Sequence, residues 1–213
     1  MPWVGLSRLS AILLLAGIAL DGAAQGASNP PVAFVTDVRA IELPAPPAGF
    51  VWHRLDDIQV AVVTPADWKK FAKQDGNAKT IAFSPKPLDQ NGQFDIGLTT
   101  RLLWHPQTRA GAEAKAMEEV LAAIVRGVES NKTDNKVLRG TVEDRGGKKM
   151  LIVRHRNAPA SLPPIIVHTV AIGDPLTGLV YEFIFESPES SWEENWKIGE
   201  VIFRRIVILF QRS

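Results

Sequence analysis

The sequence contains no cysteine among its 213 residues. That absence excludes disulfide bridges, a thiol nucleophile, a cysteine-ligated metal site and a lipid-modified cysteine. No charge of one sign dominates either, because 24 Lys and Arg residues balance 23 Asp and Glu residues, for a formal net charge of +1. Nucleic-acid-binding proteins usually carry a strongly basic face, so this balance argues against a nucleic-acid partner. Stability has to come from the packing of a core.

Long apolar runs are also absent, apart from one at the N-terminus. Arg8 precedes the run Leu9–Leu20, and the small residues Gly22 and Ala24 follow it. A positive start, a short apolar middle and a small-residue exit predict a secretory signal peptide, residues 1–24. The run is shorter than the about 20 residues of a membrane span, although an uncleaved N-terminal anchor stays open. We expect a periplasmic or secreted protein with no transmembrane domain after cleavage.

The remaining chain divides into an arm and one domain. Five prolines crowd residues 25–48, which predicts an extended arm with one possible edge strand within Val32–Ile41. Residues 49–213 are apolar enough for one domain with a substantial core, given 46% hydrophobic and 22% charged residues in the whole sequence.

Strand signals dominate the domain. Runs rich in β-branched and aromatic residues, separated by turn residues, predict a hairpin across Asp56-Asp57 and then further strands in two blocks. The expected strands are Phe50–Trp52, Ile58–Val63, Lys79–Ser84, Phe94–Trp104, Val137–Glu143, Lys149–His155, Ile165–Ile172 and Leu179–Glu186.

Two helices are predicted. Residues 110–130 carry an apolar stripe from Met117 to Val128 at helical spacing. A second helix follows the last strand, with Ser190 and Glu193 at capping-box spacing and an apolar face from Trp192 to Ile206. Gly199 weakens this helix by about 1 kcal/mol relative to Ala. Strands in runs with helices at two points predict an α+β fold, an antiparallel β-sheet covered by helices.

Short motifs along the domain resemble the PsbP-like family. They are Gly49-Phe50, Pro65-Ala66-Asp67-Trp68, Tyr181-Glu182-Phe183, and Ser187-Pro188-Glu189 with Trp192 before the final helix. The resemblance covers about residues 49–210. It implies an α/β/α sandwich, shared with the nuclear Ran-release factor and with small exported bacterial proteins. It also implies a non-catalytic adaptor or scaffold, with no active site to carry over. The chain shows no thylakoid transit region, so the resemblance does not extend to a photosynthetic role.

Signatures of catalysis are missing. The sequence has no Gly-x-Ser-x-Gly motif, no phosphate-binding glycine loop and no His-x-x-x-His or His-x-His pair. We therefore predict no catalytic residue, no metal and no cofactor. The four histidines, His53, His105, His155 and His168, are interpreted as surface or edge residues. An active site assembled only in three dimensions stays open.

Two features are candidates for partner binding. Six basic residues gather on one predicted hairpin, and alternation along a strand places Arg154 and Arg156 on the same face. This stripe fits an acidic partner, an anionic lipid or a cell-wall polymer, but it also fits a charged edge that discourages sheet-to-sheet aggregation. Trp104, at a strand end before His105-Pro106, is the best candidate for an exposed tryptophan contact. The basic residues are Arg139, Arg145, Lys148, Lys149, Arg154 and Arg156.

The sequence thus favours an exported, non-catalytic binding or adaptor protein of the bacterial cell envelope, with a protein partner. One alternative is a carrier or sensor of an apolar or lipid ligand. It requires a cavity of about 300 Å³ or more between the 110–130 helix and the sheet. A hydrolase of undetected type is the other. The sequence leaves the partner and the oligomeric state open.

Overall fold

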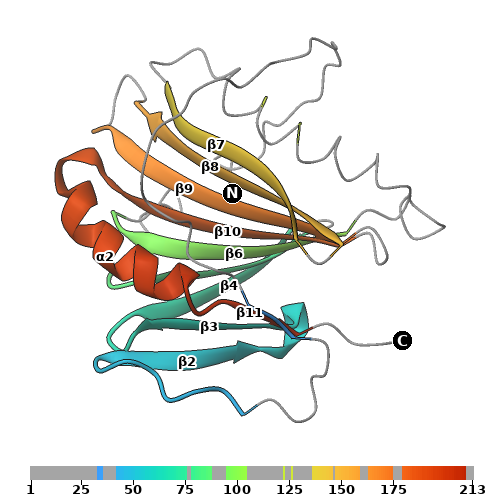
Figure 1. Cartoon of the computed structure of the whole chain (residues 1–213). Helices are drawn as coiled ribbons and strands as arrows, with labels where there is room; N and C mark the ends of the chain where they lie inside the picture. The colour runs from blue at the N-terminus through green and yellow to red at the C-terminus, as the bar shows by residue number, and fades with distance from the viewer. Residues whose placement is uncertain are drawn as a thin grey trace.

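The computed structural model describes residues 33–35, 42–75, 78–87, 95–104, 136–145, 147–158, 163–174 and 179–209, together with Ala122 and Arg126. These residues form two β-sheets and a helix that contacts both of them (Figure 1). Within these ranges, no helix has both the length and the apolar character needed to cross a membrane. The α+β class and the antiparallel sheet predicted from the sequence are confirmed.

The smaller sheet has four strands in the order β1-β11-β3-β2. Its centre is the predicted hairpin, β2 (Phe50–Leu55) and β3 (Val60–Pro65), joined by the short 3₁₀ helix η1 (Asp56–Ile58). Strand β3 is almost wholly buried because it lies inside the sheet and carries a continuous apolar run. On its other side, β11 (Val207–Leu209) pairs antiparallel with β3 and parallel with β1 (Ala33–Val35).

The larger sheet is antiparallel throughout, in the order β4-β5-β6-β10-β9-β8-β7. Five of its strands follow the predicted strands to within a few residues at each end, and β6 begins three residues later than expected. Its strands are β4 (Lys69–Asp75), β5 (Ala78–Ser84), β6 (Gly97–Trp104), β7 (Lys136–Arg145), β8 (Lys148–Asn157), β9 (Ile165–Asp174) and β10 (Leu179–Pro188).

The C-terminal segment differs from the prediction at both ends. Helix α2 spans Trp192–Phe203 and is preceded by the 3₁₀ helix η3 (Glu189–Ser191). The residue before α2 is Ser191, and no side chain caps it, so the predicted capping box of Ser190 and Glu193 is wrong. The helix also ends earlier than expected, and Ile206 leads into β11 instead of continuing the helical face.

Helix α2 lies against the larger sheet through its two tryptophans. Trp192 and Trp196 stand one turn apart and both contact Phe185 of β10, with ring centroids 6.0 and 5.9 Å away. Gly199 fits beneath Trp196, because a Cβ atom at this position would lie 2.8 Å from the Trp196 ring. The glycine that lowers helix propensity is therefore required by the packing.

One face of the larger sheet is covered by two different elements. The small sheet covers the β5 region, where His53 of β2 contacts Phe83 at 4.6 Å between ring centroids. Helix α2 covers the β9 and β10 region. A single buried cluster joins these layers, and its members include Val62, Phe83, Phe185, Phe203 and Ile208. The strands β7 and β8 extend beyond α2 at the far end of the sheet (Figure 1).

The helix predicted over residues 110–130 lies outside the described residues, except for Ala122 and Arg126, which are both helical. The apolar stripe from Met117 to Val128 is outside them as well, and so is the cavity that an apolar ligand would occupy beside it.

Candidate functional site

A row of side chains crosses the larger sheet where helix α2 meets it. Strand pairing places Arg139 of β7 opposite Arg154 of β8, Arg154 opposite His168 of β9, and His168 opposite Phe185 of β10. Directly opposed residues point to the same face of a sheet. The row therefore runs from two guanidinium groups at the open end to an aromatic cluster under the helix.

Trp192 and Trp196 of α2 pack over this row, where both contact Arg154 and Trp196 also contacts His168. Their rings are stacked, with centroids 5.2 Å apart and an interplanar angle of 18°. The Arg154 guanidinium carbon lies 4.2 Å from the Trp196 ring centroid and 4.9 Å from that of Trp192. This cation–π distance is typical of a favourable contact. Arg154 is therefore held in place by the helix, which fixes the direction of its charge.

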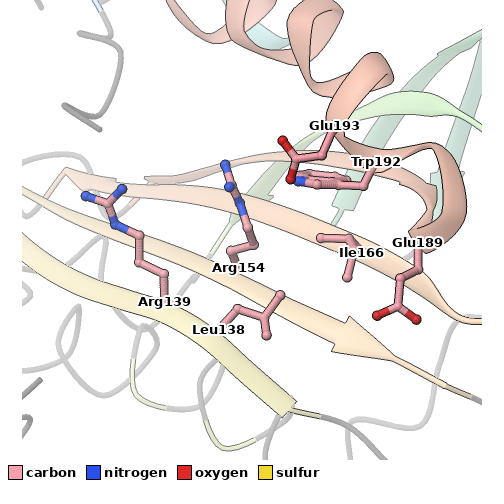
Figure 2. A pocket seen from close by; sticks show the side chains of 7 residues that line it. All are labelled: Leu138, Arg139, Arg154, Ile166, Glu189, Trp192 and Glu193. Carbon is pink, nitrogen blue, oxygen red and sulfur yellow. The ribbon is translucent and has the colours of Figure 1, made fainter. Parts of the chain in front are cut away.

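A pocket of about 390 Å³ opens where the sheet extends past the helix. Figure 2 shows Arg139 and Arg154 rising from neighbouring strands, with Trp192 and Glu193 of the helix facing them. The side chains of Leu138 and Ile166 add apolar surface to the same hollow. We call this the Arg139–Arg154 pocket; its lining residues are Leu138, Arg139, Arg154, Ile166, Glu189, Trp192 and Glu193.

Arg154 and Glu189 differ in how their charged groups are satisfied. Arg156 donates through Nε to both carboxylate oxygens of Glu189, at 3.0 and 2.9 Å, so this acid is engaged. The pKa of Arg154 is lowered, first by its burial and then by the neighbouring positive charge of Arg139, while Glu193 acts in the opposite direction. Arg154 Nε is buried with no hydrogen-bond partner within the described residues. An anionic group entering the pocket would accept a hydrogen bond from Arg154 Nε and offset the charge of Arg154.

The histidines nearest the pocket are buried, so the prediction that they are surface or edge residues is wrong for His155 and His168. His168 is enclosed by Trp196 and Phe203, with ring centroids at 4.6 and 4.8 Å. Burial, reinforced by Arg154 and Arg139, lowers the pKa of His168 to about 3. Burial alone lowers the pKa of His155 to about 4. Both rings are therefore neutral at physiological pH.

His155 and His168 do not form a pair. His155 lies opposite Val167, and it points to the other face of the sheet from Arg154 and His168, because neighbouring residues on a strand alternate. His53 contacts the Thr64 hydroxyl through Nε2 at 2.9 Å, and His105 lies outside the described residues. Within the part of the chain that the structure describes, no three His, Asp or Glu residues gather as a possible metal site.

A second polar cluster lies on the opposite face of the larger sheet. Glu182 is buried, and its carboxylate oxygen Oε2 is 3.7 Å from Arg101 Nη1 on the neighbouring strand. Burial raises the pKa of Glu182, and Arg101 acts against this rise. The arrangement is that of a buried ion pair between β6 and β10 and is separate from the Arg139–Arg154 pocket.

The structure brings together two of the three residues singled out from the sequence. Arg154 and Arg156 share the helix-bearing face, as predicted, since one contacts Trp192 and the other Glu189. Trp104 lies elsewhere, at the end of β6 opposite Leu179. Phe185, in the row of Arg154, is six residues further along β10, so Trp104 is about 20 Å away along the sheet. The side chain of Trp104 is outside the described residues.

The pocket residues that were not singled out are Leu138, Ile166, Glu189, Trp192 and Glu193. These residues come together because the start of α2 lies beside β7 and β8. The first residue of α2, Trp192, is 35 positions after Asn157, the last residue of β8. The sequence does show two acidic residues, Glu189 and Glu193, on either side of Trp192 after the last predicted strand. Which basic residues lie near these acids depends on the order of the strands, which the sequence alone does not show.

Comparison with solved structures identifies the architecture. The solution structure of cyanobacterial PsbP (CyanoP) from Synechocystis sp. PCC 6803 superposes with a TM-score of 0.50 at 10% identity, covering 80% of this chain and 98% of that one. The chain has a PsbP-like fold. The PsbP-like fold expected from the sequence motifs is thereby confirmed, at a low sequence identity.

Two further structures resemble this PsbP-like chain less closely. LpqN of Mycobacterium tuberculosis, described as involved in cell envelope biogenesis, has a TM-score of 0.48 and 15% identity over 75% of this chain and 90% of its own. The Ran-binding protein Mog1p of Saccharomyces cerevisiae has a TM-score of 0.45 and 11% identity over 76% and 96%. Neither a family model nor a curated protein matches the sequence.

Proposed function

We propose that this protein is an exported, non-catalytic binding protein of the bacterial cell envelope, and that its protein partner docks at the Arg139–Arg154 pocket. Export is supported by the sequence pattern of residues 1–24, with Arg8, the apolar run Leu9–Leu20 and the small residues before position 25. The absence of cysteine is compatible with an oxidising compartment.

The observation that carries the proposal is the pair of neighbouring guanidinium groups over an apolar surface. Arg154 is fixed against two tryptophans, and Arg139 stands beside it. Tryptophan and arginine are the residue types most enriched at binding hot spots, where a pocket excludes water around a charged contact. An acidic side chain of the partner would bind the guanidinium groups, and an adjacent apolar side chain would contact Leu138 and Ile166.

A binding assay with charge-altered variants tests this proposal. Arg139→Glu and Arg154→Met are compared with Lys86→Glu, which reverses a charge that pairs with Asp95 away from the pocket. We expect a partner captured from the host envelope fraction to be lost with either pocket variant and kept with the control. Equal capture by all variants would reject the pocket as the docking site.

Arg156→Glu is less informative than the sequence suggested, although Arg156 lies beside the pocket. Its guanidinium is bound to Glu189, at the start of the segment leading into α2. A reversal at Arg156 would place two carboxylates together and disturb the position of Trp192. Loss of binding in that variant would therefore not distinguish contact with a partner from displacement of the helix.

A further inference from the structure

Strand β7 is an edge of the larger sheet, and within the described residues it pairs with β8 alone (Figure 1). It is ten residues long, and no described strand pairs with the backbone donors and acceptors on its outer side. Such an edge is a template for pairing with another strand.

The exposed apolar side chains of the described residues are concentrated on this strand. Among the described residues, the exposed large apolar side chains are Val137, Leu138 and Val142, all on β7, with exposed fractions of 37%, 47% and 60%. Isolated exposed apolar residues are normal, but their gathering on one strand whose outer side has no partner among the described strands marks an interaction surface.

If β7 pairs with β7 of a second copy, each face of one sheet has to continue into the same face of the other sheet. From Arg139 to Asp144 the odd-numbered residues share the face of Arg154, and the even-numbered ones share the opposite face. Directly opposed residues of an antiparallel pair point to the same side. A two-fold axis perpendicular to the sheet must therefore pass through a residue of β7, not between two residues.

Among these registers, the one centred on Thr141 matches charge and shape. It places Arg139 opposite Glu143 of the second copy, twice, because of the symmetry. It also places Val142 against Gly140, which has no side chain, and pairs Thr141 with itself. A register centred on Val142 would oppose Arg139 and Arg145, which is a repulsive pair. Thr141 Oγ1 is buried without a hydrogen-bond partner within the described residues, and a Thr–Thr pair supplies one after rotation about χ1.

We infer that two copies of this chain associate through antiparallel pairing of their β7 strands, centred on Thr141, into one continuous β-sheet. The interface is isologous, since the same strand contributes from each copy. The charges on β7 favour this register over the one centred on Val142, so a basic hairpin is compatible with an edge that has a partner. Leu138 and Arg139 belong both to this edge and to the docking pocket proposed above, whereas Thr141 and Glu143 do not line that pocket. Variants at Thr141 and Glu143 therefore test the dimer separately from the docking site.

Charge reversal tests the register. For the purified protein, light scattering should give a mass that rises with concentration to twice that of one chain. Arg139→Glu and Glu143→Arg each create two repulsive contacts in the dimer, so each should remain a monomer, whereas the combined variant should recover the dimer. Far-UV circular dichroism confirms that each variant is folded. A wild-type protein that stays monomeric, or a dimer unaffected by the single reversals, would overturn the inference.

A cysteine pair gives a second measurement that leaves the charges unchanged. The chain has no cysteine, so an introduced thiol is unique. In the proposed register two Thr141→Cys residues face each other with Cα atoms about 4.5–5.5 Å apart, within disulfide range. Two Gly140→Cys residues are diagonal, about 8 Å apart, which is beyond that range. Mild oxidation should cross-link the first variant and not the second. Equal cross-linking of the two would contradict the register and with it the proposal.

Discussion

His168 is a polar side chain in an apolar enclosure. It is 2% exposed, its ring faces Trp196 and Phe203, and neither ring nitrogen has a hydrogen-bond partner within the described residues. A buried polar group without a partner costs about 1–3 kcal/mol. The residue therefore lowers the stability of the fold at the point where α2 meets the sheet.

We expect His168→Leu to stabilise the protein by about 1–2 kcal/mol, because the substitution removes two unpaired nitrogens at a similar volume. Urea unfolding followed by fluorescence measures the change. His53→Leu is the matched control, since His53 is bonded to the Thr64 hydroxyl and its replacement should not stabilise. A destabilised His168→Leu would show that the imidazole has a role that its surroundings do not reveal.

The same burial predicts how stability depends on pH. The folded-state pKa values, about 3 for His168 and about 4 for His155, lie below the value of about 6.5 in an unfolded chain. As pH falls below about 6.5, the unfolded histidines bind protons and the folded ones do not. Each group then lowers the free energy of unfolding by up to about 1.4 kcal/mol per pH unit, until the pH reaches its folded-state pKa.

Glu182 and Glu186 act in the opposite direction, because burial raises their pKa values and protonation favours the folded state. Comparison of His168→Leu with the wild type isolates the histidine contribution. Between about pH 6 and pH 4, the variant should lose stability less steeply, by about 1.4 kcal/mol per pH unit. Parallel stability curves for the two proteins would contradict a depressed pKa at His168.

At the scale of the elements, Gly199 shows packing overriding propensity. Alanine favours helix over glycine by about 1 kcal/mol. At this position, however, its Cβ atom would lie 2.8 and 2.9 Å from ring atoms of Trp196 and 3.1 Å from Phe185. Overpacking of this kind typically costs about 1–3 kcal/mol.

We therefore expect Gly199→Ala to lower the melting temperature despite its better helix propensity. Calorimetry measures this, with Gly140→Ala as the control. At Gly140, on strand β7, the nearest atom to an added Cβ is Val153 Cγ2 at 3.7 Å, an ordinary contact, so that variant should be neutral or more stable. Stabilisation by Gly199→Ala would mean that α2 can rise from the sheet without cost.

The elements that the sequence predicted are those with strong local signals. The hairpin of β2 and β3 and the strands β7 to β10 carry β-branched runs bounded by turns, and their type needed no knowledge of the fold. Strand β4 was missed because its sequence, Lys-Lys-Phe-Ala-Lys-Gln-Asp, is polar and pairs only at a sheet edge. Strand β11 was missed because Val207–Leu209 gains its partners from β1 and β3, far away in the sequence.

The part of the candidate site that follows from local spacing along one strand or one helix was predictable from the sequence. Alternation along one strand placed Arg154 and Arg156 on the same face, and helical spacing paired Trp192 with Trp196. The contact between these two groups depends on α2 crossing over β9 and β10 toward β8, and no local pattern specifies that crossing. The burial of His155 and His168 was missed because β8 and β9 are interior strands, which only the sheet order reveals.

At the scale of the whole molecule, the two sheets share one core. The buried cluster contains Val60 and Val62 from the small sheet, Phe185 from the large sheet, and Phe203 from α2. The segment from α2 to β11 ties the layers together, because the helix packs on one sheet and the strand belongs to the other. Neither sheet can open without exposing the apolar face of its neighbour.

This shared core predicts a single cooperative unfolding transition. Secondary structure followed by far-UV circular dichroism and tryptophan fluorescence should give the same midpoint in urea, because Trp68, between β3 and β4, and Trp196 on α2 both pack in the shared core. Ile208→Asp, which buries a charge in β11 where Ile208 is 0% exposed, should shift both midpoints downward to the same extent. A lower midpoint by one probe alone would show that the small sheet unfolds separately, and that α2 with its bound Arg154 can stay docked on the large sheet without it.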